Sequence, residues 1–234
     1  MARATSAPAT KRVAHSVPTF SWSSPTRWTT KPTPVAILVA GLIIFGVGDW
    51  LLIASRLGNS PWSVLAGGID RHVHLGIGTV TVITSVVVLL VWIPLRQRPG
   101  LGTVANAAII GTVVELLDRN VGAITNLGAR SVMLVGGLLL TGIGGAMYLS
   151  TQLGPGPRDG LMTRLGQLLH RPIAHVRMAI EVTVLAVGWA LGGRLGVGTF
   201  VYAAAIGHVL AFCVGQLHRL DQGPSTFGPT PTQA

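Results

Sequence analysis

The segment GLIIFGVGDWLLIASRLGNSP (41–61) recurs 96 residues later as GLLLTGIGGAMYLSTQLGPGP (137–157). The same register, extended without a gap, pairs residues 41–120 with residues 137–216, and 25 of these 80 positions are identical. Gly, Ala, Leu and Val are common in the chain, so chance supplies some of the matches. Chance does not readily keep one register over three apolar stretches, and the sequence therefore predicts an internal duplication.

The composition excludes most soluble classes of protein. Apolar residues make up 49% of the 234 residues and charged residues only 10%, against about 25% charged in ordinary soluble domains. A soluble enzyme would lack the charge to cover its surface, and a disordered chain needs low hydrophobicity. The net charge of +10 does not indicate nucleic acid, because excess Lys and Arg gather in the cytoplasmic loops of membrane proteins. We therefore expect an integral membrane protein.

Six apolar segments are long enough to cross a bilayer, which needs about 20 helical residues. They are residues 35–55, 75–95, 101–117, 131–150, 172–192 and 196–217. Unbroken alternation typical of a β-barrel is absent from the sequence, so the spans must be helices. The predicted fold class is all-α: a polytopic transmembrane helix bundle of about six spans.

Charge placement and the repeat together predict the topology. With the N-terminus inside, the cytoplasmic segments hold 11 Lys and Arg residues and the outer loops hold five, which favours both termini in the cytoplasm. Each repeat has three spans, and an odd number inverts the second copy in the membrane. The predicted organisation begins with a disordered basic cytoplasmic tail at 1–34 and a first membrane repeat at 35–120. An outer connecting loop at 121–130 leads to a second membrane repeat at 131–218 and a polar C-terminal tail at 219–234.

Each repeat breaks its first helix at the same place, in LGNSPWSVL (57–65) and LGPGPRDGL (153–161). Proline lacks a backbone N–H and glycine tolerates positive φ, so both end helices. The residues that make these breaks are Gly58 and Pro61 in the first repeat and Gly154, Pro155, Gly156 and Pro157 in the second. The short segments 62–73 and 158–170 follow. They are either interfacial amphipathic helices or re-entrant segments, and inversion places the two breaks on opposite sides of the membrane.

The run LGPGPRDGLM (153–162), with the repeated Gly-Thr and Ile-Gly pattern at 101–111 and 197–207, resembles the YczE/YyaS/YitT group of bacterial membrane proteins. The resemblance covers roughly residues 40–218. It implies a multi-pass protein of the bacterial cytoplasmic membrane and carries over no catalytic residue. The first repeat departs from the motif, with Asn59, Ser60, Trp62 and Ser63 where the second has Pro155, Gly156, Arg158 and Asp159.

Ionisable residues inside spans are costly, so each is a candidate for function. Arg177 and Glu181 lie four residues apart on one helix face, either as an ion pair that orders helices or as a substrate or proton site. The first repeat has Thr81 and Ser85 at the matching positions. His208 lies in the middle of the last span, where it either packs through a hydrogen bond or relays protons.

Four further acidic or basic residues lie toward span ends or at the second break. Asp49 and Glu115 either reach water separately or form an acidic outer vestibule. Arg158 and Asp159 follow the second break, where Asp159 caps the short helix or the two form a charged gate. The single cysteine, Cys213, and histidines on opposite predicted sides do not indicate a metal site, and no cofactor motif is present.

The leading hypothesis is a small secondary transporter or permease for an unidentified solute or ion. The alternative is a non-transporting accessory or scaffold protein that supports a membrane-bound partner. No catalytic constellation stands out, so we do not expect an enzyme. The glycines of residues 136–145 permit close helix contact, first between the two repeats and second between two copies of the chain. The expected partners are the lipid bilayer, the solute and a second copy in a homodimer.

Overall fold

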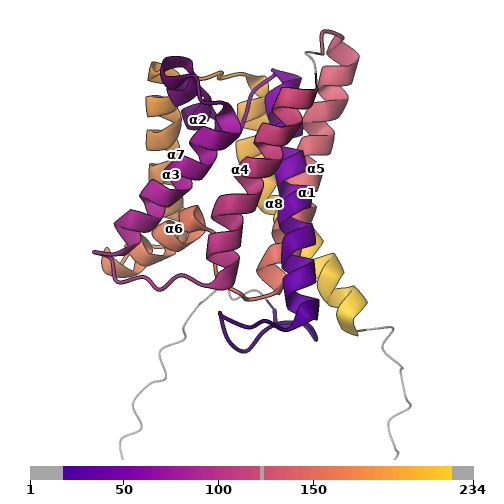
Figure 1. Ribbon diagram of the computed structural model, residues 1–234, viewed down its shortest axis with the longest axis vertical. Helices are drawn as coiled ribbons and strands as arrows, with labels where there is room; N and C mark the ends of the chain where they lie inside the picture. The colour runs from indigo at the N-terminus through magenta and orange to yellow at the C-terminus, as the bar shows by residue number, and fades with distance from the viewer. Residues whose placement is uncertain (1–17, 122–123, 223–234) are drawn as a thin grey trace, which may run out of the picture.

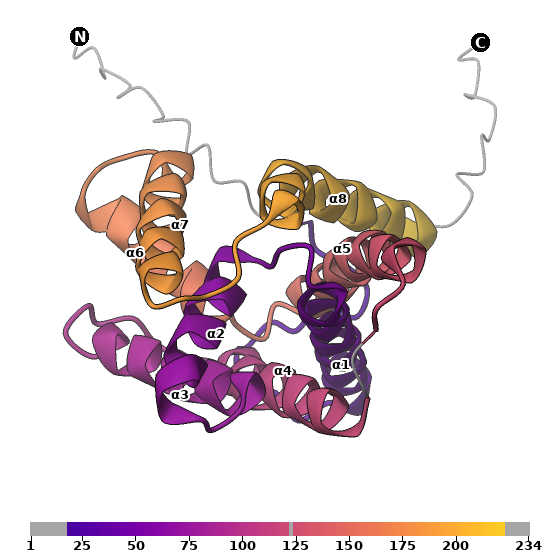
Figure 2. The same ribbon diagram turned by 90° about the horizontal axis from the view of Figure 1, so that it is seen from above.

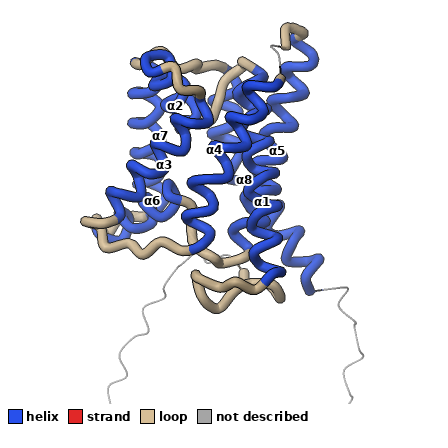
Figure 3. Tube along the Cα trace, viewed as in Figure 1, coloured by secondary structure: helices blue, strands red, loops and turns tan. Residues whose placement is uncertain are grey.

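The computed structural model describes residues 18–121 and 124–222, and every regular element in those ranges is an α-helix (Figure 1, Figure 3). The all-α fold class is confirmed. Residues 1–17, 122–123 and 223–234 lie outside the described ranges, and they include half of the predicted N-terminal tail, most of the predicted C-terminal tail and part of the connecting loop. The helices are α1 Pro32–Ser55, α2 Pro61–Val73, α3 Ile77–Trp92, α4 Leu101–Asn120, α5 Leu127–Ser150, α6 Pro157–Leu168, α7 Ile173–Ala190 and α8 Val197–Gln222.

The order of elements repeats in the same register as the sequence. Helices α2, α3 and α4 begin at Pro61, Ile77 and Leu101, and α6, α7 and α8 begin 96 residues later. Proline at N1 starts both short helices, as expected for a residue with no N–H to donate. The predicted short segments at 62–73 and 158–170 are thus confirmed as helices.

Five helices are long and apolar enough to cross a membrane: α1, α4, α5, α7 and α8. Helix α3, with 16 residues, is shorter than the predicted span at 75–95. It forms a sixth candidate only together with α2, from which it is bent by 111°. Because one face of α2 is buried against α3 and α7, this helix belongs to the bundle interior and does not lie free on its surface.

The two repeats meet where α1 and α5 cross in antiparallel directions. Gly41 lies against Gly144, and Gly48 lies against Gly137, two contacts that the 96-residue register exchanges. A Cβ atom on Gly144 would lie 2.5 Å from the Gly41 carbonyl oxygen, and one on Gly137 would lie 2.8 Å from that of Gly48. Small residues at these positions let the two backbones approach closely, which is a common way to join membrane helices.

Each helix break docks onto the last helix of the other repeat. The amide of Gly198 in α8 donates to the Leu57 carbonyl at 2.8 Å, and the amide of Gly102 in α4 donates to that of Leu153 at 3.0 Å. Gly58 and Gly154 follow with φ of +135° and +122°, a conformation that favours glycine. The orphan N–H groups at the start of α4 and α8 thereby obtain carbonyl acceptors.

The pairing of helices is not equal in the two repeats. Helix α3 packs along α4, whereas the described parts of α7 and α8 make no comparable contact (Figure 2). Helix α7 instead packs against α2 and α6, and α8 packs against α5. The second repeat is therefore open on the side where the first repeat is closed.

Residues 18–31 differ from the disordered tail that the sequence predicted. The Trp22 indole donates to Ser150 Oγ at 2.9 Å, and the Ser24 amide donates to the Thr151 carbonyl at 3.0 Å. Phe20 is buried and stacks on Trp22. These contacts hold the segment against the end of α5, where aromatic side chains gain apolar burial that a count of Ser, Thr and Pro does not reveal.

Replacing Gly137 with alanine should destabilise the protein by about 1–3 kcal/mol, because the added methyl group would overpack the crossing with α1. The neighbouring Gly136→Ala variant is the matched control, since its Cβ would meet only Leu51 Cδ1 at 3.9 Å. Thermal unfolding in one detergent should give a lower midpoint for Gly137→Ala only. Equal midpoints for the two variants would contradict the described crossing.

Candidate functional site

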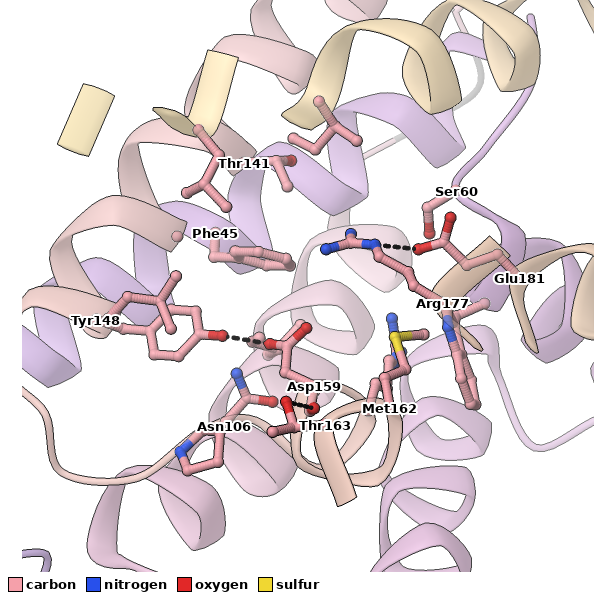
Figure 4. A pocket seen from close by; sticks show the side chains of 18 of the residues that line it. Phe45, Ser60, Asn106, Thr141, Tyr148, Asp159, Met162, Thr163, Arg177 and Glu181 are labelled. Carbon is pink, nitrogen blue, oxygen red and sulfur yellow. Dashed lines mark hydrogen bonds and ion pairs between the residues drawn. The ribbon is translucent and has the colours of Figure 1, made fainter. Parts of the chain in front are cut away.

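A central cavity of about 650 Å³ lies between the two repeats (Figure 4). Helices from both repeats line it, and the starts of the two short helices reach it through Pro61 and Arg158. Its lining mixes charged, hydroxyl and amide groups with apolar side chains. The polar members are Arg27, Ser60, Thr81, Ser85, Gln97, Asn106, Thr141, Tyr148, Arg158, Asp159, Thr163, Gln167, Arg177, Glu181 and Tyr202.

Arg177 and Glu181 form the ion pair that their spacing predicted. Arg177 Nε donates to Glu181 Oε1 at 2.9 Å, and both side chains line the cavity (Figure 4). Thr81 and Ser85, the residues at the matching positions, line it from the first repeat. Their hydroxyls donate to carbonyls within α3. The equivalent faces of α3 and α7 are therefore hydroxylic on one side of the cavity and charged on the other.

Arg158 and Trp62 occupy equivalent positions and meet at the repeat interface. The guanidinium carbon of Arg158 lies 5.0 Å from the centre of the Trp62 ring, within the range of a cation–π contact. Among the described residues, the Arg158 side chain makes neither a hydrogen bond nor an ion pair within 4.0 Å. The buried Trp62 indole N–H also lacks an acceptor. The interface thus carries donors that have no acceptor among the described residues.

Asp159 faces the cavity from the first turn of α6. Its Oδ2 accepts a hydrogen bond from the buried Tyr148 hydroxyl at 2.6 Å (Figure 4). Asp159 does not cap α6, because the N-cap position is occupied by Gly156, three residues earlier. A carboxylate so close to a helix start is also stabilised by the positive end of the helix dipole. Tyr148 was not among the predicted site residues.

Asp49 and Glu115 do not come together in an outer vestibule, as the sequence suggested they could. Asp49 is 3% exposed, and its Oδ1 accepts from Ser63 in the first turn of α2 at 2.8 Å. Its Oδ2 has no hydrogen-bond partner among the described residues. Glu115 accepts from the Thr79 amide at 3.1 Å and pairs with Arg119 at 2.6 Å. Each carboxylate therefore accepts a hydrogen bond from the first turn of a neighbouring helix, Asp49 from α2 and Glu115 from α3.

A second cavity, of about 390 Å³, is lined instead by basic residues together with Asp70 and Asp118. Its arginines are Arg56, Arg71 and Arg194. Burial and the positive charge of the neighbouring arginines lower the pKa of the Arg194 guanidinium. The end of the bundle that holds α2 (Figure 1) therefore carries a concentration of positive charge.

His208 lies outside the lining of the central cavity. It is exposed on α8, with its Nδ1 3.2 Å from the Ala204 carbonyl oxygen, so the structure separates it from Arg177 and Glu181. Of the predicted break residues, Pro61, Pro155, Arg158 and Asp159 line the cavity. Gly58, Gly154, Gly156 and Pro157 shape the turns beside it.

Sequence reasoning gave less weight to four residues that the structure brings to this site: Trp62, Asn106, Tyr148 and Tyr202. The register itself carried a signal for three of them, since it pairs Trp62 with Arg158 and Asn106 with Tyr202. Tyr148 aligns with Leu52 and had no such signal. Within residues 18–121 and 124–222, no group of three or more His, Cys, Asp or Glu side chains is arranged to hold a metal ion.

A family model matches residues 33–215, and its description is "Family of unknown function (DUF6198)". The chain belongs to the DUF6198 family. It is 38% identical to an uncharacterized protein of Haemophilus influenzae over 214 residues, 92% of this chain and 98% of that one. It is 30% identical to the uncharacterized membrane protein YczE of Bacillus subtilis, covering 76% of this chain and 83% of that one.

A third relative, the uncharacterized protein YyaS of Bacillus subtilis, is 29% identical over 73% of this chain and 87% of that one. The resemblance to YczE and YyaS is thereby confirmed, and with it a multi-pass membrane protein. No solved structure matches the chain.

Replacing Tyr148 with phenylalanine should lower the free energy of unfolding by about 1.5–3 kcal/mol, because the hydrogen bond it removes is to a charged acceptor. The matched control is Tyr202→Phe, since no hydrogen bond from the Tyr202 hydroxyl exists among the described residues. Thermal unfolding of Tyr148→Phe, Asp159→Asn and the double variant should show non-additive losses. Strict additivity would show that the two groups do not interact.

Proposed function

We propose that this chain is a small secondary transporter, not an enzyme, and that the central cavity is its solute site. The observation that carries the proposal is a cavity of about 650 Å³ at the interface of two repeats, lined by Arg158, Arg177, Asp159 and Glu181. Charged groups are costly inside a membrane unless they serve a pathway or one another. Transporter folds place their sites at such an interface, next to broken helices.

The packing of the repeats supports an inverted topology. Helices α1 and α5 are antiparallel, and the short helices α2 and α6 lie toward opposite ends of the bundle (Figure 1). Each break contacts the other repeat through the same pair of backbone groups. Inverted repeats can exchange conformations, so that one arrangement opens inward and the exchanged arrangement opens outward.

The two breaks are the proposed gates. The central cavity extends to Arg27, Gln97 and Gln167, at the end where residues 18–31 and the end of α8 lie. Toward the other end, Ser60 lines the central cavity and Asn59 lines the second cavity. Because both residues are buried, the first break separates the two cavities.

In this proposal the structure is the inward-open state of a protein in the bacterial cytoplasmic membrane, with both termini in the cytoplasm. Arg177 and Glu181 contact the solute or a proton, and Arg158 with Asp159 act at the inner gate. A second copy packed on the bundle as a homodimer is compatible with the exposed apolar faces of α7 and α8.

Cysteine accessibility tests the proposal without a known solute. Ser85 lines the cavity from α3, so Ser85→Cys in a Cys213→Ser background reports on the cavity alone. A transporter must expose that cysteine to a membrane-impermeant maleimide from each side of the membrane in turn. Labelling of Ser85→Cys in both right-side-out and inside-out vesicles is the expected result.

Two exposed positions supply the controls. Asn120→Cys, at the end of α4, should react only from outside, and Leu220→Cys, near the end of α8, only from inside. Labelling of Ser85→Cys from one side only, with both controls behaving as stated, would contradict transport. That outcome would favour the accessory or scaffold function.

A further inference from the structure

The opening between α7 and α8 gives the central cavity a side that the other repeat lacks. Ile173, Arg177 and Glu181 line the cavity from α7, and Tyr202, Ile206 and Leu210 line it from α8. The two helices nevertheless do not pack together, although the equivalent α3 and α4 do. Two helices that are long enough to span a membrane therefore line the cavity without closing against each other.

The two faces of this opening are graded from polar to apolar. Each set of three residues is spaced by four, so each forms a single stripe along its helix. On α8 the stripe runs from Tyr202 to the apolar Ile206 and Leu210. Phe45 and Leu149 continue the apolar lining on the neighbouring α1 and α5. A ligand in this position meets charge at one end and hydrocarbon surface at the other.

Two arginines, Arg158 and Arg177, and two carboxylates, Asp159 and Glu181, line the charged part of the cavity. Both carboxylates are occupied, Asp159 by the Tyr148 hydroxyl and Glu181 by Arg177. Arg158 keeps free N–H donors while its guanidinium stacks on Trp62. A guanidinium held in this way presents its edge to a carboxylate or phosphate, which it binds with two parallel hydrogen bonds.

The buried carboxylate of Asp49 is not in contact with this guanidinium. No ion pair within 4.0 Å joins Asp49 to Arg158, and Asp49 Oδ1 already accepts a hydrogen bond from Ser63. Trp62 is only 7% exposed, and its indole N–H is a second donor that has no acceptor among the described residues. Within residues 18–121 and 124–222 both donors lack acceptors, and a ligand with acceptor oxygens would satisfy them.

We propose that the ligand of the central cavity is an anionic amphiphile with a single acyl chain, which enters from the bilayer between α7 and α8. Its carboxylate binds the Arg158 guanidinium against Trp62, so that Arg158 holds the ligand as well as acting at the inner gate, and its chain lies along Ile206 and Leu210 toward the lipid. The proposal rests on the proposed function for its transport step, but the binding step can be tested alone. A wholly water-soluble anion would bind Arg158 but would make no contact with the apolar side chains between α7 and α8.

The test uses the full chain in phosphatidylcholine nanodiscs with a palmitic acid analogue that carries a photoactivatable diazirine near the end of its chain. After irradiation, mass spectrometry should map cross-links to α7 and α8 on the cavity side. Arg158→Gln should reduce the yield at least tenfold. Arg171→Gln, which removes an exposed arginine at the α6–α7 turn, should leave the yield unchanged.

Further arms separate the alternatives. The matching uncharged palmityl alcohol probe should cross-link as weakly to the wild type as the acid does to Arg158→Gln. Ile206→Trp, which narrows the opening, should reduce labelling by the acid several-fold. If Arg158→Gln does not fold, as judged by the lack of a monodisperse gel-filtration peak, the proposal is tested by the alcohol probe on the wild type and by the Ile206→Trp variant.

Three outcomes would overturn the proposal. The first is equal labelling by the acid and the alcohol probes. The second is thermal stabilisation of the protein by millimolar benzoate without any acyl-chain cross-link in the cavity. The third is cross-linking of α7 to α8 of a second copy, which would close the opening. The second outcome would leave a transporter of water-soluble anions standing. If the maleimide labels Ser85→Cys from one side only while the acyl probe still cross-links in the cavity, transport would be refuted but the binding site would stand.

Discussion

The close approach of α1 and α5 is the constraint on which the rest of the structure depends. Because Gly41, Gly48, Gly137 and Gly144 have no side chains, two antiparallel backbones approach so closely that a Cβ atom at any of these positions would lie within 3.0 Å of the other helix. No water competes for such contacts in a bilayer, so packing of small residues supplies much of the association energy. Once α1 and α5 are fixed, their C-terminal breaks meet the starts of α8 and α4, and the hydrogen bonds at Gly198 and Gly102 join the repeats a second time.

This frame explains both the cavity and its asymmetry. The breaks direct α2 and α6 back between the long helices, so their first turns, with Trp62 and Arg158, meet at the interface. The first repeat surrounds them with hydroxyls and packs α3 on α4. The second repeat replaces hydroxyls with Arg177 and Glu181 and leaves α7 apart from α8. The two repeats thus share one order of helices, while the second carries the charges and lacks the packing that joins the last two helices of the first.

Much of the fold was predictable because glycine, proline and hydropathy act locally. The breaks at Gly58 and Gly154 and the short helices after them followed from backbone chemistry alone. The weaker predictions concerned side chains whose partners are distant in sequence. Asp49 bonds Ser63 across a turn, Glu115 reaches Thr79 on another helix, and the exposure of His208 depends on the rotation of α8. The order of residues 18–31 depends on a docking surface at the end of α5, which a composition rich in Ser and Pro cannot indicate.

The most direct measurement of the central claim, that the repeats are inverted, uses two equivalent exposed positions. Arg56 and Gln152 lie 96 residues apart, each just beyond its long helix and each with φ of 55°. In a Cys213→Ser background, Arg56→Cys and Gln152→Cys are labelled in intact cells and in inverted vesicles with a membrane-impermeant maleimide. Inverted repeats predict that Arg56→Cys reacts from the outside and Gln152→Cys from the cytoplasm. Labelling of both from the same side would contradict the inverted topology and, with it, the proposed exchange between two gates.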